Sequence, residues 1–572
     1  MQDDETEAKM SYVHGVSATP LLGETIGAAL RRAARDAGGR TALISRHQNI
    51  RLTYAELDAE VSRIAAGLLA LGLSRGDRVG IWSPNNAEWL LTQYAAARAG
   101  LILVTLNPAY RVAELEYALN LSGSAAIVLA RSFKTSDYEA MLRALIPALA
   151  DPAGRVESAR LPHLKRAILI GDAVVPGFLP FAAIARTATA ESEATLAAIT
   201  PALQFDDPIN IQFTSGTTGF PKGATLTHHN ILNNGFFVGE AIRLGPDDLV
   251  CAPVPLYHCF GMVMANLACL THRAAVVYPS AGFDPLAVLE TVAAERCTAL
   301  YGVPTMFIAE LDHPDFARFD LSSLRTGIMA GSPCPITVMQ RVMERMNLRE
   351  ITIAYGMTET SPVSFQSATD DPVEKRVATV GRIQPHLEVK IIDGEGRVVP
   401  RGTPGELCTR GYAVMLGYWN EPERTAEAID AAGWMHTGDL ATIDADGYGA
   451  IVGRIKDLVI RGGENIYPRE VEEFLYRHPK VQSAQVVGLP DAKYGEELCA
   501  WIRLNDGESA TEDEIREFCR DQIAHQKIPR YIRFVDEFPM TVTGKIQKFI
   551  IRETMIADLG LAGKEDGSAR GG

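Results

Sequence analysis

The sequence lacks several features that would assign it to a special class of protein. Its eight cysteines are scattered singly, without a C-x-x-C pair, so we expect reduced thiols and a cytoplasmic protein, not a disulfide framework. The longest apolar run, "CFGMVMANLACL", has about a dozen residues and is too short to cross a bilayer. The first residues, "MQDDETEAKM", are acidic and contain no apolar stretch, which argues against a secretory signal or a transit peptide.

Positive charge is also scarce. The chain has 55 Lys and Arg against 70 Asp and Glu, a formal net charge of −15. We therefore expect no nucleic-acid partner and no anionic-membrane partner, and any anion site must be a local feature of the structure. With 572 residues and 47% hydrophobic residues, the chain is expected to form a globular protein of two or more domains.

Strand-like runs alternate with helical patterns through most of the chain, which predicts an α/β fold with largely parallel sheets. In "LTYAELDAEVSRIAAGLLALGL", Thr53 and Glu56 form a capping box, and apolar residues then recur at helical spacing. Residues from about 383 to 455 instead read as short strands interrupted by Gly, Asp and Pro. The polar stretch around Lys456 predicts a domain boundary and a hinge.

One loop has the composition of a phosphate-binding site. "TSGTTGFPKG" follows the strand-like "INIQF" and combines hydroxyls and glycines with the cation Lys222, a composition suited to a polyphosphate. It is not a Walker A sequence, because Pro221 precedes the lysine and Gly223 follows it. Taken alone, it could also be a simple glycine-rich turn, which is the less favoured interpretation.

Other stretches offer complementary chemistry. "AYGMTETSP" places Thr358 and Glu359 after a strand, which suits Mg²⁺ held by few protein ligands and by substrate phosphates. Asp439 in "WMHTGDL" could bind ribose hydroxyls or simply occupy a turn. Arg454 in "GRIKD" and Lys545 in "PMTVTGKIQK" could each be an exposed surface charge.

The set and its order resemble one family. TSGTTGFPKG, PLYHCFG, AGSP, YGMTE, TGD, GRIKD, GGENIYPREVE and TGKIQK are similar to motifs of the adenylate-forming superfamily of acyl-CoA synthetases, luciferases and peptide-synthetase adenylation domains. The resemblance covers residues from about 25 to 555, and "GVPTMF", "AGSPCP" and "GELCTRGYAVMLGYW" most resemble the medium-chain acyl-CoA synthetase branch.

The resemblance implies a fold with four parts. A large N-terminal domain at 25–455 would combine two α/β sheet subdomains with a β-rich subdomain, and bind ATP and the acyl acid. A small mobile α+β lid at 456–556 would follow, with its hinge at Lys456. A flexible segment at 1–24 and a disordered tail at 557–572 would flank them.

The resemblance also assigns roles to residues. Those implied to bind ATP are Thr214, Ser215, Gly216, Thr217, Thr218, Gly219, Lys222, Gly331, Ser332, Pro333, Tyr355, Gly356, Met357, Thr358, Asp439, Arg454 and Lys545. Thr358 and Glu359 are the implied Mg²⁺ ligands, and the implied catalytic residues are Lys545, Glu359, Thr214 and His258. The CoA path and lid would use Lys456, Gly462, Gly463 and Gly495. The acyl pocket would use Phe236, Phe237, Tyr257, His258, Met357, Pro362 and Val363.

The implied reaction has two steps. A carboxylic acid and ATP would give acyl-AMP and pyrophosphate, and CoA would then give acyl-CoA and AMP. His258 stands where amino-acid-activating relatives carry an Asp, which favours an acid without an α-amino group. The resemblance to the medium-chain branch implies a medium-chain fatty acid. Loading of a separate carrier protein and a luciferase-like oxygenation stay open, and so does a homodimer. A non-catalytic nucleotide sensor is disfavoured, because Lys545, Glu359 and Asp439 are all present.

Overall fold

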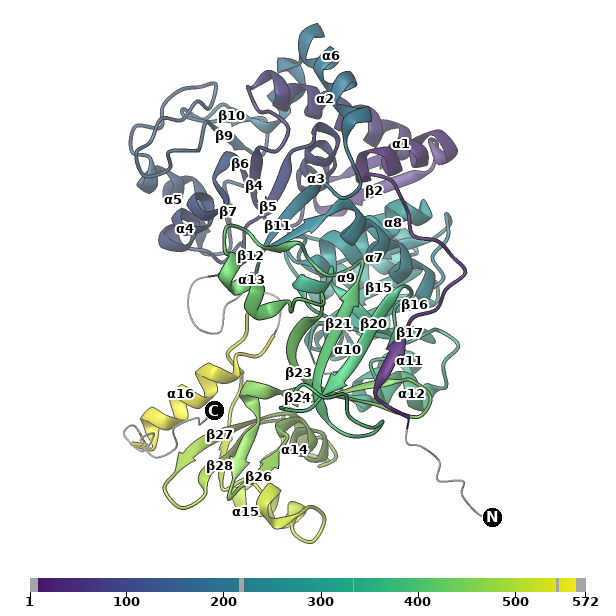
Figure 1. The fold of residues 1–572 in the computed structure, drawn as a ribbon, viewed down its shortest axis with the longest axis vertical. Helices are drawn as coiled ribbons and strands as arrows, with labels where there is room; N and C mark the ends of the chain where they lie inside the picture. The colour runs from purple at the N-terminus through teal and green to yellow at the C-terminus, as the bar shows by residue number, and fades with distance from the viewer. Residues whose placement is uncertain (1–8, 215–220, 333, 542–544, 562–572) are drawn as a thin grey trace. The chain divides into compact units, whose positions relative to one another are not determined.

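The computed structural model describes residues 9–214, 221–332, 334–541 and 545–561 (Figure 1). The chain divides into two compact units. Unit 1 comprises the residues up to Tyr12, Lys390–Cys408 and the residues from Thr437 onward, and unit 2 comprises Val13–Val389 and Thr409–His436. This division passes through four strands of one sheet, whereas the sequence places the boundary near Lys456, which stays a prediction.

Unit 2 contains an eight-stranded sheet in the order β10-β9-β6-β4-β5-β11-β12-β22. Its strands are β4 (Arg78–Trp82), β5 (Ile102–Thr105), β6 (Ser124–Leu129), β9 (Arg166–Leu169), β10 (Leu179–Pro180), β11 (Pro208–Thr214), β12 (Lys222–Thr227) and β22 (Gly417–Tyr418). The first six strands in spatial order are parallel, and β12 and β22 are antiparallel to their neighbours. The short strand β22 therefore brings a segment from much later in the sequence beside β12.

A second sheet of nine strands has the order β19-β18-β17-β16-β15-β13-β14-β2-β3. Its strands are β2 (Thr41–Ser45), β3 (Ile50–Thr53), β13 (Leu249–Cys251), β14 (Ala275–Tyr278), β15 (Ala299–Gly302), β16 (Thr326–Ala330), β17 (Glu350–Gly356), β18 (Val363–Gln366) and β19 (Arg382–Ile383). The six central strands are parallel, and the antiparallel strands lie at the two edges. This confirms the largely parallel sheets that the sequence predicts.

Helices connect the two sheets into one hydrophobic core. That core draws on α1 (Ile26–Ala37), α2 (Tyr54–Ala70), α3 (Ala87–Ala99), α7 (His228–Ala241), the π-helix η4 (Phe260–Leu267) and α8 (Ala268–His272), together with strands of both sheets. The other helices of unit 2 are α4 (Val112–Ser122), α5 (Tyr138–Leu145), α6 (Ala190–Ile199), α9 (Pro285–Glu295), α10 (Pro304–Leu311), α11 (Ile336–Arg345), α12 (Val373–Ala378) and α13 (Pro422–Ala428). The capping box predicted for α2 is confirmed, since Thr53 and Glu56 exchange hydrogen bonds with each other's main chain.

The β-rich region forms a five-stranded sheet in the order β1-β20-β21-β23-β24. Its strands are β1 (Tyr12–His14), β20 (Leu387–Ile392), β21 (Gly405–Gly411), β23 (Met435–Ile443) and β24 (Gly449–Arg454). The strand content confirms the prediction for residues 383–455. The flexible segment assigned to 1–24 needs correction at its described part, because β1 joins this sheet and Ser11 N–H donates to Val399 O at 2.8 Å.

The C-terminal part of unit 1 is a small α+β structure, as predicted. Its strands are β25 (Val459–Arg461), β26 (Glu464–Ile466), β27 (Val481–Asp491), β28 (Gly495–Leu504) and β29 (Tyr531–Phe534), with helices α14 (Pro468–Leu475), α15 (Glu512–Cys519) and α16 (Lys548–Asp558). Two hydrophobic clusters support it, one around Val471 of α14 and one around Ile551 of α16.

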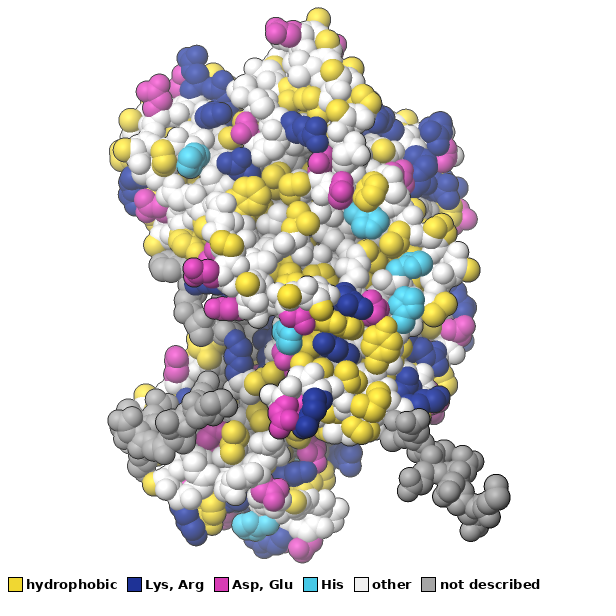
Figure 2. All heavy atoms as spheres, viewed as in Figure 1, with side chains coloured by type: hydrophobic (Ala, Val, Ile, Leu, Met, Phe, Trp, Pro, Cys, Tyr) yellow, Lys and Arg dark blue, Asp and Glu magenta, His cyan; other side chains and the backbone are white. Residues whose placement is uncertain are grey.

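The surface charges and the cysteines agree with what the composition predicts. All eight cysteines are buried, and none of them forms a disulfide. On the face seen in Figure 2, basic and acidic side chains of the described residues are interspersed, which agrees with an anion site that is local. Among the described residues, no helix combines the length and the hydropathy needed to span a membrane.

One buried carboxyl group is a source of instability in unit 2. Glu310 of α10 is 1% exposed, and neither of its carboxyl oxygens has a hydrogen-bond partner among the described residues. Burial raises the pKa of this carboxyl well above its ordinary value. Because the folded state holds the proton more tightly than the unfolded state does, stability falls as pH rises above the unfolded pKa, until pH reaches the folded pKa.

We therefore expect Glu310→Met to stabilise the protein, with a gain over wild type that grows by about 1.4 kcal/mol for each pH unit in this window. Thermal midpoints of both proteins at pH 5, 6 and 7 measure this. The matched control is Glu290→Met on the neighbouring helix α9, where the carboxylate is exposed and no such pH-dependent gain is expected. A gain that did not change with pH would contradict the assignment of a neutral, buried Glu310.

Candidate functional site

The two ends of the predicted phosphate loop meet at the edge of the eight-stranded sheet. β11 ends at Thr214 and β12 begins at Lys222, and these two residues are register partners in an antiparallel pair. The five predicted ligands between them, Ser215, Gly216, Thr217, Thr218 and Gly219, lie outside the described residues. The hairpin thus presents the hydroxyl of Thr214 and the cation of Lys222 on adjacent strands.

The segment after β17 holds the predicted metal ligands in a tight turn. Thr358 and Glu359 are buried in a 3₁₀ turn, and Met357 N–H donates to Pro362 O at 2.9 Å across it. A Cβ atom on Gly356 would overlap the Pro362 carbonyl oxygen, so this position requires glycine. Thr358 Oγ1 also accepts a hydrogen bond from Cys259 Sγ at 3.5 Å. The turn is therefore held by main-chain contacts on both sides of its two polar side chains.

Tyr418 links the loop cation to the turn. Its hydroxyl donates to Glu359 Oε1 at 2.8 Å, and Lys222 Nζ lies 4.4 Å from the centre of its ring. Sequence reasoning missed this residue, although it stands inside the quoted motif "GELCTRGYAVMLGYW". No local pattern indicates its role, because the contact depends on β22 pairing with β12.

The residues predicted to surround adenine follow the ends of two neighbouring parallel strands. Ala330 of β16 and Ala354 of β17 are register partners. Gly331, the first residue after β16, and Tyr355, near the end of β17, each come one residue later. Gly331 has φ of 90°, a value that favours glycine, and Ser332 follows it. Pro333 lies outside the described residues. Ligand sites of open α/β sheets occur at such carboxyl ends.

The predicted acyl residues lie on α7, in the segment before η4, and between the end of β17 and the start of β18. Phe236 and Phe237 are on α7, where Phe236 stacks on His272 at 5.3 Å and Phe237 lies 6.2 Å from Tyr412. Asn234, one turn earlier on the helix, exchanges two hydrogen bonds with the main chain of Val363, which follows Pro362 on β18. Sequence reasoning missed Asn234. Whether the two phenylalanines line a substrate pocket stays a prediction.

Tyr257 and His258 precede the π-helix η4. The Tyr257 carbonyl accepts a hydrogen bond from Gln212 of β11 at 3.1 Å, and the His258 carbonyl accepts the N–H groups of Gly261 and Met262. The His258 imidazole is partly exposed, and its Nδ1 accepts Phe260 N–H at 3.2 Å. π-helical turns are frequent at functional sites. Here the first residues of the π-helix hydrogen-bond to the His258 carbonyl and fix the position of its main chain.

Asp439 and Arg454 come together in unit 1. They are register partners on β23 and β24, and Arg454 Nε lies 3.0 Å from Asp439 Oδ1. Asp439 is 6% exposed, whereas the arginine is exposed. Two of the residues implied to bind ATP are therefore neighbours, and the ribose role of Asp439 stays a prediction.

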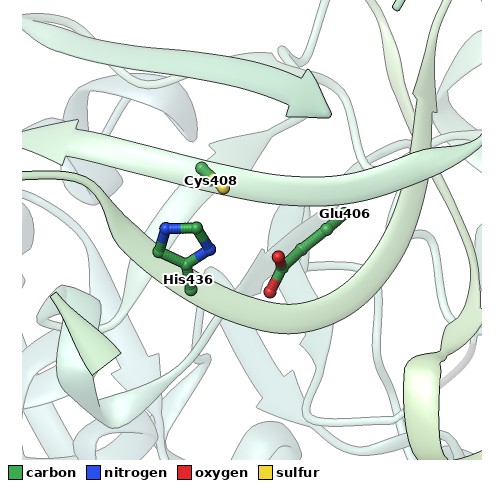
Figure 3. Close-up of side chains that lie close together, drawn as sticks. All are labelled: Glu406, Cys408 and His436. Atoms are coloured by element: carbon green, nitrogen blue, oxygen red, sulfur yellow. The ribbon is translucent and has the colours of Figure 1, made fainter. Parts of the chain in front are cut away.

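The side chains of Glu406, Cys408 and His436 lie close together (Figure 3). Ligand-type atoms of Glu406 and Cys408 on β21 and of His436 on β23 lie within 4.8 Å of one another. Glu406 Oε1 accepts Gly438 N–H at 3.2 Å, and Thr437 Oγ1 donates to Leu407 O at 2.7 Å. We assign Glu406, which sequence reasoning missed, to holding the residue before Asp439.

The lid residues fall into two groups. Gly462 and Gly463 form the turn between β25 and β26 with φ of 61° and 85°, and Gly495 begins β28 opposite Arg461. The three predicted glycines are therefore neighbours. Lys456 is exposed in a short 3₁₀ turn after β24.

Lys545 lies before α16 and is hydrogen-bonded to Thr541. Its main-chain N–H donates to Thr541 Oγ1 at 3.1 Å, and its carbonyl accepts Thr541 N–H at 2.8 Å. The side chain is partly exposed.

Comparisons with known proteins place this chain in a family. The model described as "AMP-binding enzyme" matches residues 30–419, and the model described as "AMP-binding enzyme C-terminal domain" matches residues 470–545. The chain is 49% identical to the putative acyl-CoA synthetase YngI of Bacillus subtilis over 95% of this chain and 100% of that protein. It is 47% identical to the human mitochondrial medium-chain acyl-CoA ligase ACSF2 over 96% of this chain and 91% of that protein.

Solved structures agree with the predicted fold class. The anthranilate CoA ligase AuaEII in complex with anthranoyl-AMP is 27% identical, with a TM-score of 0.84 over 95% of this chain and 99% of that chain. ATP-bound MatB from Rhodopseudomonas palustris is 29% identical, with a TM-score of 0.81 over 94% of this chain and 100% of that chain. The chain belongs to the AMP-binding enzyme family of adenylate-forming enzymes.

Proposed function

We propose that this protein is an ATP- and Mg²⁺-dependent acyl-CoA synthetase that acts on medium-chain fatty acids. The observation that carries the proposal is that Tyr418 joins Lys222, the register partner of Thr214, to the Glu359 carboxylate. The full-length similarity to proteins named acyl-CoA synthetase and medium-chain acyl-CoA ligase supports the choice of reaction.

In the first step, an oxygen of the acid attacks the α-phosphorus of ATP, and pyrophosphate leaves. Both reactants are anions, so the protein must offset charge and hold the attack in line. Lys222 and Thr214 would hold the β- and γ-phosphates, and Lys545 would contact the α-phosphate and the acid. Asp439 would bind the ribose hydroxyls.

The turn after β17 fits a magnesium ion. Thr358 and Glu359 offer hard oxygen donors, and the described contact of the Glu359 carboxylate is a neutral hydroxyl, which leaves its negative charge in place. Mg²⁺ bound there with ATP would neutralise phosphate charge and polarise the reacting phosphate. Glu359 would hold it with Thr358.

In the second step, the thiolate of CoA attacks the acyl carbonyl, and AMP leaves. The three neighbouring glycines Gly462, Gly463 and Gly495 would let the pantetheine chain approach the main chain closely. Rotation of the lid about Lys456 would withdraw Lys545 after the first step and present these glycines for the second.

The nature of the acid follows from the residues that would meet it. His258 offers no negative charge for a substrate ammonium, and Phe236, Phe237, Tyr257, Met357, Pro362 and Val363 are mostly apolar. An aliphatic tail suits this set. Cytoplasmic location and a homodimer stay predictions from the sequence.

Pyrophosphate release tests the proposal. We expect acids of six to twelve carbons to give release that depends on ATP and Mg²⁺, with acyl-CoA as product when CoA is present. Acetate, palmitate, benzoate and amino acids serve as comparison substrates. A single burst of pyrophosphate that CoA leaves unchanged would favour carrier-protein loading, and oxygen consumption with light emission would favour a luciferase-like enzyme. Absence of release with every acid would contradict the proposal.

A further inference from the structure

We propose that Tyr418 is a positioning residue that fixes the Glu359 carboxylate for metal binding and sets the place of the Lys222 ammonium beside it. The inference rests on the proposed function, in which Glu359 binds Mg²⁺ and Lys222 binds phosphate. It adds a residue for which the family motifs and the sequence give no role.

The main chain around Tyr418 is held at several points. β22 pairs with β12, so that Tyr418 lies opposite Ala224, two residues after Lys222. Trp419 N–H donates to Gly223 O at 2.7 Å, and Tyr418 N–H donates to Thr425 Oγ1 at 2.9 Å. The tyrosine ring is therefore anchored to the same strand that carries the loop cation.

The same segment also holds the main chain of Glu359. Met415 N–H donates to Glu359 O at 2.9 Å, three residues before the tyrosine whose hydroxyl contacts the carboxylate. Gly417 between them has φ of 144°, and a Cβ there would lie 2.7 Å from Thr425 Cγ2. Residues 415–418 thus hydrogen-bond to both the carbonyl oxygen and the carboxylate of Glu359.

The chemistry of a phenol suits this role. An arginine or lysine partner would fix the carboxylate but also neutralise it, whereas a neutral hydroxyl orients it and leaves its charge for a cation.

The ring of Tyr418 interacts with the ammonium group of Lys222. An ammonium 4.4 Å from the ring centre is within range of a cation–π interaction. Donation of the phenolic proton to a carboxylate makes the ring more electron-rich, which strengthens that interaction. The Tyr418 side chain therefore contacts both the Glu359 carboxylate and the Lys222 ammonium. A direct ion pair between these two groups would instead neutralise both charges.

The test compares affinities for ATP with and without Mn²⁺, measured by calorimetry in the absence of acid. The dissociation constant of ATP without Mn²⁺, divided by that with Mn²⁺, measures how much the metal strengthens ATP binding. Tyr418→Phe removes one oxygen and keeps the ring, so we expect the ratio to fall roughly tenfold, the size of a hydrogen bond to a charged group. The control Tyr138→Phe also removes one buried hydroxyl, which donates to Pro108 O at 2.7 Å, and should leave the ratio unchanged.

A second comparison separates positioning from general loss of structure. In a Glu359→Gln background, Tyr418→Phe should have little further effect on the ratio, because the amide that the hydroxyl would then position binds the metal only weakly. An unchanged ratio in Tyr418→Phe, with wild-type protein responding to Mn²⁺, would overturn this inference alone. A wild-type protein whose ATP affinity did not respond to the metal would overturn it together with the proposed metal role of Glu359.

Discussion

Lys545→Ala is expected to slow adenylate formation by about 10²–10³-fold, the usual cost of removing one group that stabilises transition-state charge. In the proposed mechanism, this ammonium offsets the charge that develops when a carboxylate attacks the α-phosphorus. The lysine plays no part in the second step. We therefore expect the variant to convert chemically prepared acyl-AMP and CoA into acyl-CoA at close to the wild-type rate.

The two half-reactions are measured separately, the first by acid-dependent exchange of pyrophosphate into ATP and the second by acyl-CoA formation from acyl-AMP. Lys527→Ala is the matched control, because this lysine also lies in the C-terminal part of unit 1 but pairs with the exposed Glu470. A variant that lost both half-reactions equally would contradict the assignment of Lys545 to the first step only.

Local patterns predicted the fold well where they are self-contained. The helix at Tyr54–Ala70 has its capping box within four residues, and its apolar spacing predicts the buried face. The loop between Thr214 and Lys222 and the turn at Thr358 and Glu359 are also recognisable from short stretches. Each of these signals depends on neighbours in the sequence.

Contacts between distant segments were beyond such patterns. Tyr418 and Glu359 are separated by 59 positions, and only the pairing of β22 with β12 brings the hydroxyl to the carboxylate. Asn234 reaches Val363 across 129 positions. A single Tyr or Asn can make many kinds of contact in a fold, so the residue type alone does not indicate which distant group it contacts.

The edges of the domains were hard to predict for a related reason. β1 lies in a stretch that is weakly patterned, and a strand of three residues carries too little alternation to be recognised. Its place in the sheet depends on β20, which is more than 370 positions away. The unit division likewise follows from packing of residues 390–408 with later strands.

Glu359→Gln is the second change with a large expected effect. The amide has nearly the same shape as the carboxylate, and its oxygen can still accept the Tyr418 hydroxyl, so the thermal midpoint should stay close to wild type. The negative charge is lost, however, and amide oxygen is a weaker ligand for Mg²⁺. We expect pyrophosphate release at a fixed, low Mg²⁺ concentration to fall by about 10²–10³-fold.

A titration with Mg²⁺ makes this prediction specific. The variant should need more metal for half-maximal rate, whereas Glu374→Gln, a change of an exposed carboxylate on α12, should follow the wild-type curve. An identical metal requirement in Glu359→Gln and wild type would remove Glu359 from the metal site. Tyr418→Phe keeps the charge of Glu359 and loses its orientation, and Glu359→Gln does the reverse. Together the two variants therefore measure how much of the metal affinity comes from each.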